Sequence, residues 1–219
     1  MPAYFNLSLL FRRKDIYHTF VKDFYEAMED AGIKFKSGFW GFEEDSWEEI
    51  IKWNQEKLEQ NFCLGCTQHH KHGYKQMLYD FYVFSEARGF WMNQYPEADA
   101  FTYEFIVPED EVVCYDCVGK EILENGFPCE VLKERFLEEK VNVLVEAAKK
   151  IWQFPYVKAV QTGLEESSAS TGLTELETGV LPNIQPFAIV EEGGVAAEDS
   201  KYPAIPMEGR KGILLRSRI

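Results

Sequence analysis

Two hydrophobic periods follow one another in the first part of the chain. Residues 5–11 carry an apolar side chain at every second position, which is typical of a strand with one buried face. Over residues 16–31 the apolar side chains recur every three or four positions, and Gly32 follows where a helix would end. Residues 33–36 alternate again, at the start of a segment that extends to residue 40. The pattern predicts a strand, a helix and a second strand, with the helix covering one face of a sheet.

A second helix and three further strands are predicted next. Ser46 and Glu49 have the spacing of a capping box, in which each residue satisfies a free backbone amide of the other, so we expect a helix to begin there. Residues 75–84, 87–93 and 100–109 are rich in aromatic and β-branched side chains. Because the connections between these three segments are short, we expect them to pair as antiparallel neighbours.

The longest helix is predicted in the C-terminal half. It should begin near Pro128, because proline is favoured in the first turn of a helix, and Pro155 should end it. The apolar residues between the two prolines form one stripe at helical spacing. Short strands are predicted at residues 156–161, 186–192 and 212–219.

This order of elements predicts an α+β fold. We expect a mixed, mostly antiparallel sheet with about three helices packed on one face, and with loops and aromatic side chains partly covering the other. No stretch has the composition of an interdomain linker, so residues 1–219 are interpreted as a single domain. Small, polar and acidic residues predict mobile loops near 164–182 and 192–206.

The composition narrows the class of protein. The chain has 219 residues, of which 46% are hydrophobic and 15% aromatic, as in a packed globular domain. No apolar run approaches the roughly 20 residues that span a bilayer, and the N-terminus has its apolar residues before its basic ones, the reverse of a secretory signal. We therefore expect a cytoplasmic protein that does not bind a membrane.

The charge indicates which partners are excluded. There are 37 acidic and 23 basic residues, for a net charge of −14. A surface this negative repels the phosphates of nucleic acids and of anionic lipids, and it attracts a basic protein. The simpler interpretation is that the negative charge keeps the protein in solution. The oligomeric state does not follow from the sequence.

The most chemically distinctive stretch is Cys-Leu-Gly-Cys-Thr-Gln-His-His-Lys-His at residues 63–72. Two cysteines three positions apart can present two thiolates to zinc from one turn, and histidines complete such sites. The candidate ligands are Cys63, Cys66, His69 and His72. A second pair, Cys114 and Cys117, lies much further along the chain than the about 15–20 residues of compact zinc sites, in a strand-like run. The alternative is that the 63–72 stretch is a solvated loop after a helix, and that no cofactor is bound.

Two functional hypotheses remain, because the chain lacks a phosphate-binding loop, a dinucleotide fingerprint and a nucleophile elbow. The first is a non-enzymatic protein-binding domain, similar in role to intracellular inhibitor or immunity proteins, whose acids steer a basic partner and whose tryptophans anchor it. Its candidate residues are Trp40, Glu43, Glu44, Asp45, Trp47 and Glu48. The second is a zinc-binding protein or small metal-dependent hydrolase that uses residues 63–72. For the first hypothesis, the alternative interpretation is that Trp47 packs on its own helix and that the acids are merely solvated.

Overall fold

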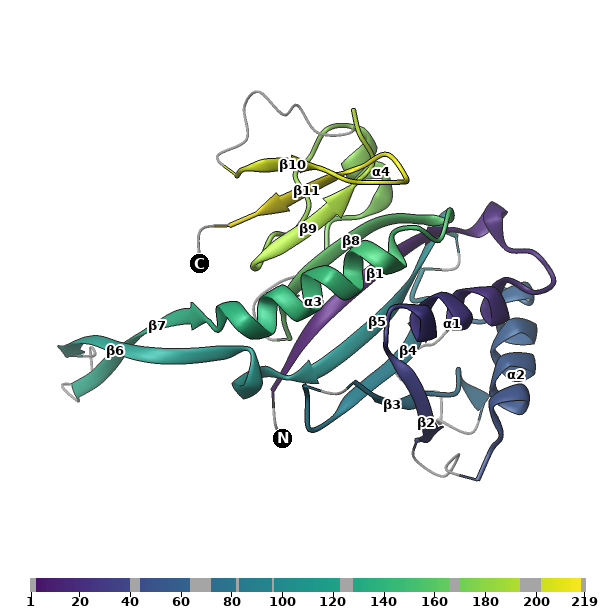
Figure 1. The fold of residues 1–219 in the computed structure, drawn as a ribbon, viewed down its shortest axis with the longest axis horizontal. Helices are drawn as coiled ribbons and strands as arrows, with labels where there is room; N and C mark the ends of the chain where they lie inside the picture. Colours follow the sequence, from purple (N-terminus) through teal and green to yellow (C-terminus); the bar gives the residue numbers. More distant parts are fainter. Residues whose placement is uncertain are drawn as a thin grey trace.

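A large antiparallel sheet forms the centre of the structure (Figure 1). The computed structural model describes residues 3–39, 44–63, 72–81, 83–95, 97–122, 128–165, 170–193 and 202–217. The α-helices of this part are α1 (Phe20–Asp30), α2 (Trp47–Glu59), α3 (Glu138–Ile151) and α4 (Leu173–Glu177), with 3-10 turns η1 (Arg13–Asp15) and η3 (Glu109–Glu111). The strands are β1 (Tyr4–Arg12), β2 (Lys34–Gly38), β3 (Met77–Asp80), β4 (Ala87–Met92), β5 (Ala100–Pro108), β6 (Val113–Ile122), β7 (Pro128–Phe136), β8 (Val157–Leu164), β9 (Phe187–Val190), β10 (Ala204–Pro206) and β11 (Ile213–Arg216).

Nine of these strands join in the order β10-β11-β9-β8-β1-β5-β4-β3-β2, and β6 pairs with β7 in a separate two-stranded sheet. Every pairing between named strands is antiparallel in the part of the chain that is described. A parallel contact occurs as an isolated bridge between Thr162 and Ile184. The predicted α+β class with a mostly antiparallel sheet is confirmed, including the antiparallel neighbours β3, β4 and β5.

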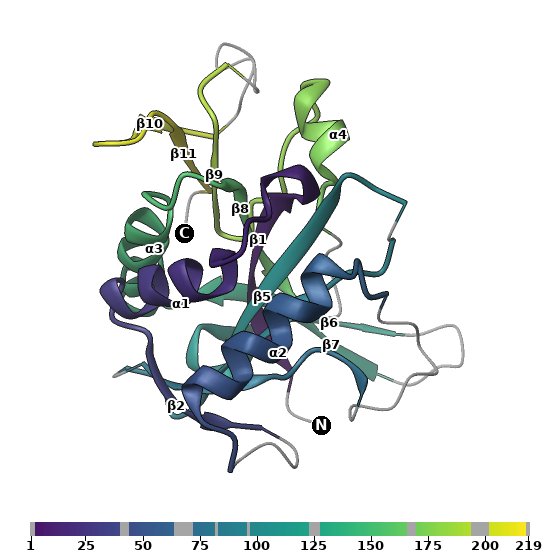
Figure 2. The ribbon, with the colours of Figure 1, turned by 90° about the vertical axis from the view of Figure 1, so that its right-hand side faces the viewer.

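The two faces of the sheet differ in what covers them. On one face, the alternate β1 residues from Phe5 to Phe11 are fully buried together with the apolar stripes of α1, α2 and α3. Figure 2 shows α1 and α2 in front of the sheet. On the other face, Leu10 of β1 packs with Leu173 and Leu176 of α4. Three helices therefore share one face, as predicted, and the short α4 lies on the opposite face. No helix among the described residues is long and apolar enough to cross a membrane.

Local signals place the ends of the first two helices. Gly32 follows α1 with a φ of 93°, a conformation that costs glycine nothing and explains why the helix ends there. At the start of α2, the Ser46 hydroxyl accepts a hydrogen bond from the Glu49 amide, and the Glu49 carboxylate accepts one from the Ser46 amide. The predicted capping box is confirmed. The helix predicted over residues 16–31 begins later, at Phe20, because the backbone of Ile16 is extended.

The predicted helix from Pro128 is wrong in its first part. Residues 128–136 form β7, and α3 begins at Glu138. Residues 131–136 do not alternate between apolar and polar side chains, and Leu132 and Phe136 lie four residues apart, so the sequence pattern favours a helix. The antiparallel pairing with β6 decides for the strand. The predicted loops also contain short elements, since α4 lies within 164–182 and β10 within 192–206.

Candidate functional site

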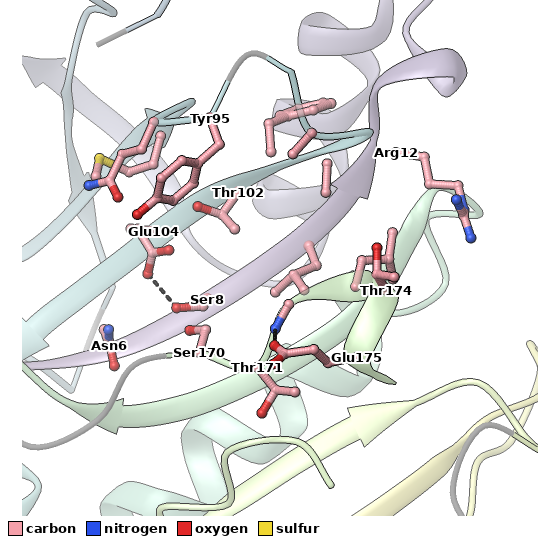
Figure 3. Close-up of a pocket in the computed structure, with 18 of the residues that line it drawn as sticks. Asn6, Ser8, Arg12, Tyr95, Thr102, Glu104, Ser170, Thr171, Thr174 and Glu175 are labelled. Carbon is pink, nitrogen blue, oxygen red and sulfur yellow. Dashed lines mark hydrogen bonds between the residues drawn. The ribbon is translucent and has the colours of Figure 1, made fainter. Parts of the chain in front are cut away.

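A pocket lies on the sheet face opposite α1, α2 and α3. Its floor is made by side chains that alternate with the core residues of β1, β5 and β4, and its volume is about 760 Å³. Asn6, Ser8 and Leu10 contribute from β1, and Thr102 and Glu104 from β5 (Figure 3). The same alternation that fills the core with one set of side chains therefore presents the other set to the pocket.

The register of the strands places four side chains of this sheet face in one row. Gln161 of β8 lies opposite Ser8 of β1, Ser8 lies opposite Glu104 of β5, and Glu104 lies opposite Phe90 of β4. The Ser8 hydroxyl donates a hydrogen bond of 2.6 Å to the Glu104 carboxylate. The row therefore places a carboxylate between a polar and an aromatic neighbour on the pocket floor.

Glu104 is the most unusual ionisable group of the pocket. Protein atoms surround its carboxyl group closely, although the side chain is partly accessible from the pocket. Burial raises the pKa of Glu104, and the hydrogen bonds from Ser8 and Thr102 offset only part of this rise. Among the residues that the structure describes, no lysine or arginine forms an ion pair with Glu104. Its negative charge therefore has hydrogen-bond donors but no counter-charge.

The carboxylates at the rim of the pocket have partners already. Arg12 forms ion pairs with Asp99, at 3.1 Å, and with Glu177. Glu175 accepts a hydrogen bond of 2.9 Å from the Gly172 amide at the start of α4. Glu165, another lining residue, accepts one of 3.2 Å from the amide of Tyr4. The lining thus contains four carboxylates and a single arginine within the described residues, so its potential is negative.

One wall of the pocket is attached to the sheet through Gln161, which is 1% exposed. Its amide nitrogen donates to the Thr171 carbonyl at 2.8 Å. Its carbonyl oxygen accepts from the amides of Thr171, at 2.9 Å, and Asn183, at 2.7 Å. Three hydrogen bonds from one side chain therefore hold residues 170–183 over β8 and define the shape of the pocket on that side.

The lining combines hydroxyl, amide and carboxylate groups with apolar side chains. Within the described residues it contains no histidine, lysine or cysteine. Ser8 has a carboxylate but no imidazole beside it, so the usual base for activating a hydroxyl nucleophile is missing from this part of the chain. Carboxylate, amide and hydroxyl groups beside Leu10, Phe90 and Met92 suit a ligand with one polar end and an apolar body.

The described candidate zinc ligands, Cys63 and His72, are not among the residues that line this pocket, and Cys66 and His69 lie outside the described residues. The Cys63 thiol donates to the Gln94 carbonyl at a sulfur–oxygen distance of 3.6 Å. No group of three or more potential metal ligands is found among the residues described. Zinc binding by Cys63, Cys66, His69 and His72 stays a prediction.

The second pair of cysteines lies in β6 as free thiols. Cys114 donates to the Arg135 carbonyl, and Cys117 donates to the Gly119 carbonyl. Both hydrogen bonds are made within the β6–β7 hairpin, so they bring neither thiol to the Cys63 side chain.

The predicted protein-binding face is only partly described, since Trp40 and Glu43 lie outside the described residues. Trp47 is partly buried rather than exposed as expected, because its ring packs against Phe35 and Tyr25 with centroid distances of 5.0 and 5.5 Å. Asp45 forms an ion pair of 2.5 Å with Lys75. Of the remaining candidates, Glu44 and Glu48 are exposed on the surface.

Nothing in the sequence pattern marks Glu104 or Ser8 as site residues. Both appear in the sequence as polar positions inside alternating strands, which is also the pattern of a solvated sheet face. Only the pairing of β1 with β5 places them opposite each other. No protein-family model matches the chain, and no curated protein matches it in sequence.

Proposed function

We propose that the protein is a binding protein that receives a positively charged organic group in the pocket on the open sheet face. The observation that carries this proposal is the Glu104 carboxyl group on the pocket floor, which has a donor in Ser8 and no basic partner among the described residues. An ammonium, amidinium or guanidinium group would supply the missing counter-charge and donate hydrogen bonds to the carboxylate.

The rest of the pocket fits an organic cation. A volume of about 760 Å³ lies within the roughly 300–1,000 Å³ of small-molecule sites. Phe90, Met92 and Leu10 provide apolar contact for the body of the ligand. Because the rim is also negative, an anion would meet repulsion where a cation is attracted.

A basic protein would bind this acidic chain through the same contact, between a cationic group and the Glu104 carboxylate. A lysine or arginine side chain on a partner presents the group that the pocket would bind as a free amine. The protein-binding hypothesis therefore remains, but the proposed contact with the partner is at the pocket and no longer at residues 40–48. The zinc hypothesis gains no specific observation from the described residues, and elemental analysis of the purified protein tests it.

Ligand-observed NMR with a pair of matched probes tests the proposal. Phenethylammonium should bind, and phenylpropionate, of similar size and opposite charge, should not. Glu104→Gln keeps the size of the side chain and removes its charge. It should weaken phenethylammonium binding by roughly 10- to 100-fold, as expected for a charged hydrogen bond of about 1.5–3 kcal/mol. Glu121→Gln removes one exposed charge outside the pocket and is the matched control.

Two comparisons complete this experiment. N-acetyl-lysine amide presents the ammonium group as a lysine residue of a protein does. If the ligand is a protein, this compound should bind more tightly than phenethylammonium; if the ligand is a free amine, it should not. Affinity for either cation should fall as the pH decreases through the raised pKa of Glu104, because protons then compete with the ligand. Equal binding of the anionic probe, or unchanged cation binding by Glu104→Gln, would contradict the proposal.

A further inference from the structure

Four aromatic residues line the pocket, and they differ in whether their rings already have a partner. These residues are Tyr4, Phe90, Tyr95 and Phe101. The guanidinium group of Arg88 lies 5.2 Å from the centre of the Tyr4 ring. Phe101 is 3% exposed and packs within the core. Among the described residues, the rings of Phe90 and Tyr95 pack against no other ring and no cationic side chain. Two rings of the lining are therefore available to a ligand.

Phe90 lies beside Glu104 because their strands are neighbours. The two residues are directly opposite each other in the pairing of β4 with β5. Side chains at opposite positions have Cβ atoms about 4.5–5.5 Å apart. Phe90 alternates with the buried residues Gly89 and Trp91, so its half-buried ring belongs to the pocket face. An aromatic ring attracts a cation within about 6 Å of its centre, so the Phe90 ring is within reach of a cation held by the Glu104 carboxylate.

Tyr95 approaches the same carboxylate from the connection between β4 and β5. Figure 3 shows its side chain pointing into the pocket toward Glu104. The backbone of this connection is anchored, because Asn93 is 1% exposed and accepts a hydrogen bond of 2.7 Å from Arg13. The Ala98 amide also donates to the Tyr95 carbonyl at 2.9 Å. Tyr95 itself is 66% exposed. Its position is thus fixed, while most of its ring surface is left for a ligand.

The Glu104 carboxylate lacks a positive charge more than it lacks hydrogen-bond donors. The Ser8 hydroxyl donates to it at 2.6 Å, and the Thr102 hydroxyl also donates. A primary ammonium group brings three further N–H donors, each of which needs an acceptor when it leaves water. A quaternary ammonium group carries the same charge without any N–H donor. Its methyl groups suit the two available rings and the Met92 side chain of the lining.

We propose that the pocket selects a quaternary ammonium group, held between the Glu104 carboxylate and the rings of Phe90 and Tyr95. This inference rests on the proposed function, since it requires that the pocket binds a cation, and it adds the class of cation. A carboxylate and the face of an aromatic ring both attract positive charge, and neither requires an N–H donor from the ligand. Phe90 and Tyr95 are thus the residues that determine specificity, and Glu104 supplies the charge.

Ligand-observed NMR with two pairs of probes tests the selection. Phenethyltrimethylammonium and phenethylammonium share one body and differ in three methyl groups. The methylated probe should bind about tenfold more tightly, as expected for contact with two rings. Choline should bind, whereas neohexyl alcohol, in which a carbon atom replaces the charged nitrogen, should not. N-acetyl-trimethyllysine amide, compared with choline, distinguishes a methylated protein from a small molecule as the source of the group. In either case, the methylated probe should bind more tightly than its unmethylated counterpart.

Substitution of the two rings tests their role. Tyr95→Leu and Phe90→Leu each remove one ring and keep an apolar side chain. Each should reduce the affinity ratio of phenethyltrimethylammonium to phenethylammonium by about threefold, and the double variant should abolish the preference. Tyr95→Phe keeps the ring, so it is the matched control and should keep the native ratio. Thermal unfolding shows whether each variant is folded.

The outcomes separate this inference from the proposed function. If phenethylammonium binds at least as tightly as its methylated analogue, and Glu104→Gln weakens that binding, the inference is overturned while the proposed function stands. If neither cation binds, the proposed function fails and the inference fails with it. A folded double variant that keeps the native ratio would show that the rings do not select the ligand. Neohexyl alcohol binding as tightly as choline would show that the methyl groups are recognised without the charge, which also overturns the inference.

Discussion

At the scale of single residues, Glu104 has the clearest physical consequence. Burial raises its pKa above the ordinary value, so the folded protein binds this proton more tightly than the unfolded chain does. The stability that this group contributes is therefore fully present below the unfolded pKa, and it is lost as the pH rises through the folded pKa. Above the folded pKa, the Glu104 carboxylate is ionised without a counter-ion, and this destabilises the folded protein. It is the charge that the proposed ligand would neutralise.

This sign leads to a prediction for Glu104→Gln in the absence of ligand. A glutamine can still accept the hydrogen bond from Ser8, and it carries no buried charge. The variant should be more stable than the native protein at neutral pH, and the difference should disappear below about pH 4, where both side chains are neutral. Urea denaturation across this pH range measures it. Glu121→Gln should show no such pH-dependent difference, and a less stable Glu104→Gln at neutral pH would contradict the assigned direction of the pKa shift.

At the scale of elements, the segment of residues 170–183 depends on a neighbouring strand for its position. It contains only the five-residue helix α4, and Gln161 of β8 supplies three of its hydrogen bonds to the sheet. Leu173 and Leu176 also pack on the sheet through Leu10, but a segment with so little regular structure opens more easily than the strands beside it. The pocket wall and the sheet floor therefore differ in stability, although both line the same cavity.

Gln161→Leu tests this dependence. The substitution keeps a similar volume and removes the three hydrogen bonds, at an expected cost of about 3 kcal/mol of unfolding free energy at roughly 1 kcal/mol each. Hydrogen exchange should accelerate in residues 170–183 before the rest of the sheet, and phenethylammonium binding should weaken. Gln153→Leu, which removes the Gln153 hydrogen bond to the Arg210 amide in another loop, is the control and should leave exchange in residues 170–183 unchanged. Uniform acceleration in both variants would show that Gln161 has no specific role in holding the wall.

At the scale of the whole molecule, the excess of acidic residues sets the balance of electrostatic energy. Pairs such as Arg12–Asp99 and Lys36–Asp80 are at least partly exposed, and such pairs each contribute about 0–1 kcal/mol. The net charge of −14 means that repulsion among the remaining acids opposes the compact state.

We therefore expect salt to stabilise the protein. Raising the NaCl concentration from about 10 to about 150 mM shortens the screening length to roughly 8 Å and should increase the unfolding temperature. Calorimetry at one fixed, low protein concentration measures this effect. Replacing the exposed residues Glu44 and Glu121 by lysine reduces the net negative charge and should make the salt response smaller. A lower unfolding temperature at the higher salt concentration would show that ion pairs outweigh the repulsion.

The elements that were predicted correctly are those whose signals are local. The alternation of residues 5–11, the glycine after α1 and the capping box before α2 each depend on a few consecutive residues. Of the large apolar residues on the periodic segments, Phe24, Phe105 and Leu144 are buried, and Phe35 and Phe136 are partly buried against the core. For β7 the sequence predicts a helix, because Leu132 and Phe136 lie at helical spacing, and only the pairing with β6 makes it a strand.

The sequence by itself determined the α+β class, the faces of its periodic segments and the acidic surface, because hydrophobic period and net charge are properties of neighbouring residues and of composition. Tertiary structure alone decided which polar positions meet. Ser8, Glu104 and Gln161 come from three distant strands, and antiparallel pairing aligns them in one row. It also decided that β6 and β7 leave the main sheet and expose apolar side chains. Strand pairing is a long-range choice, in which a shift of one residue would turn every side chain to the other face, so no local pattern can specify it.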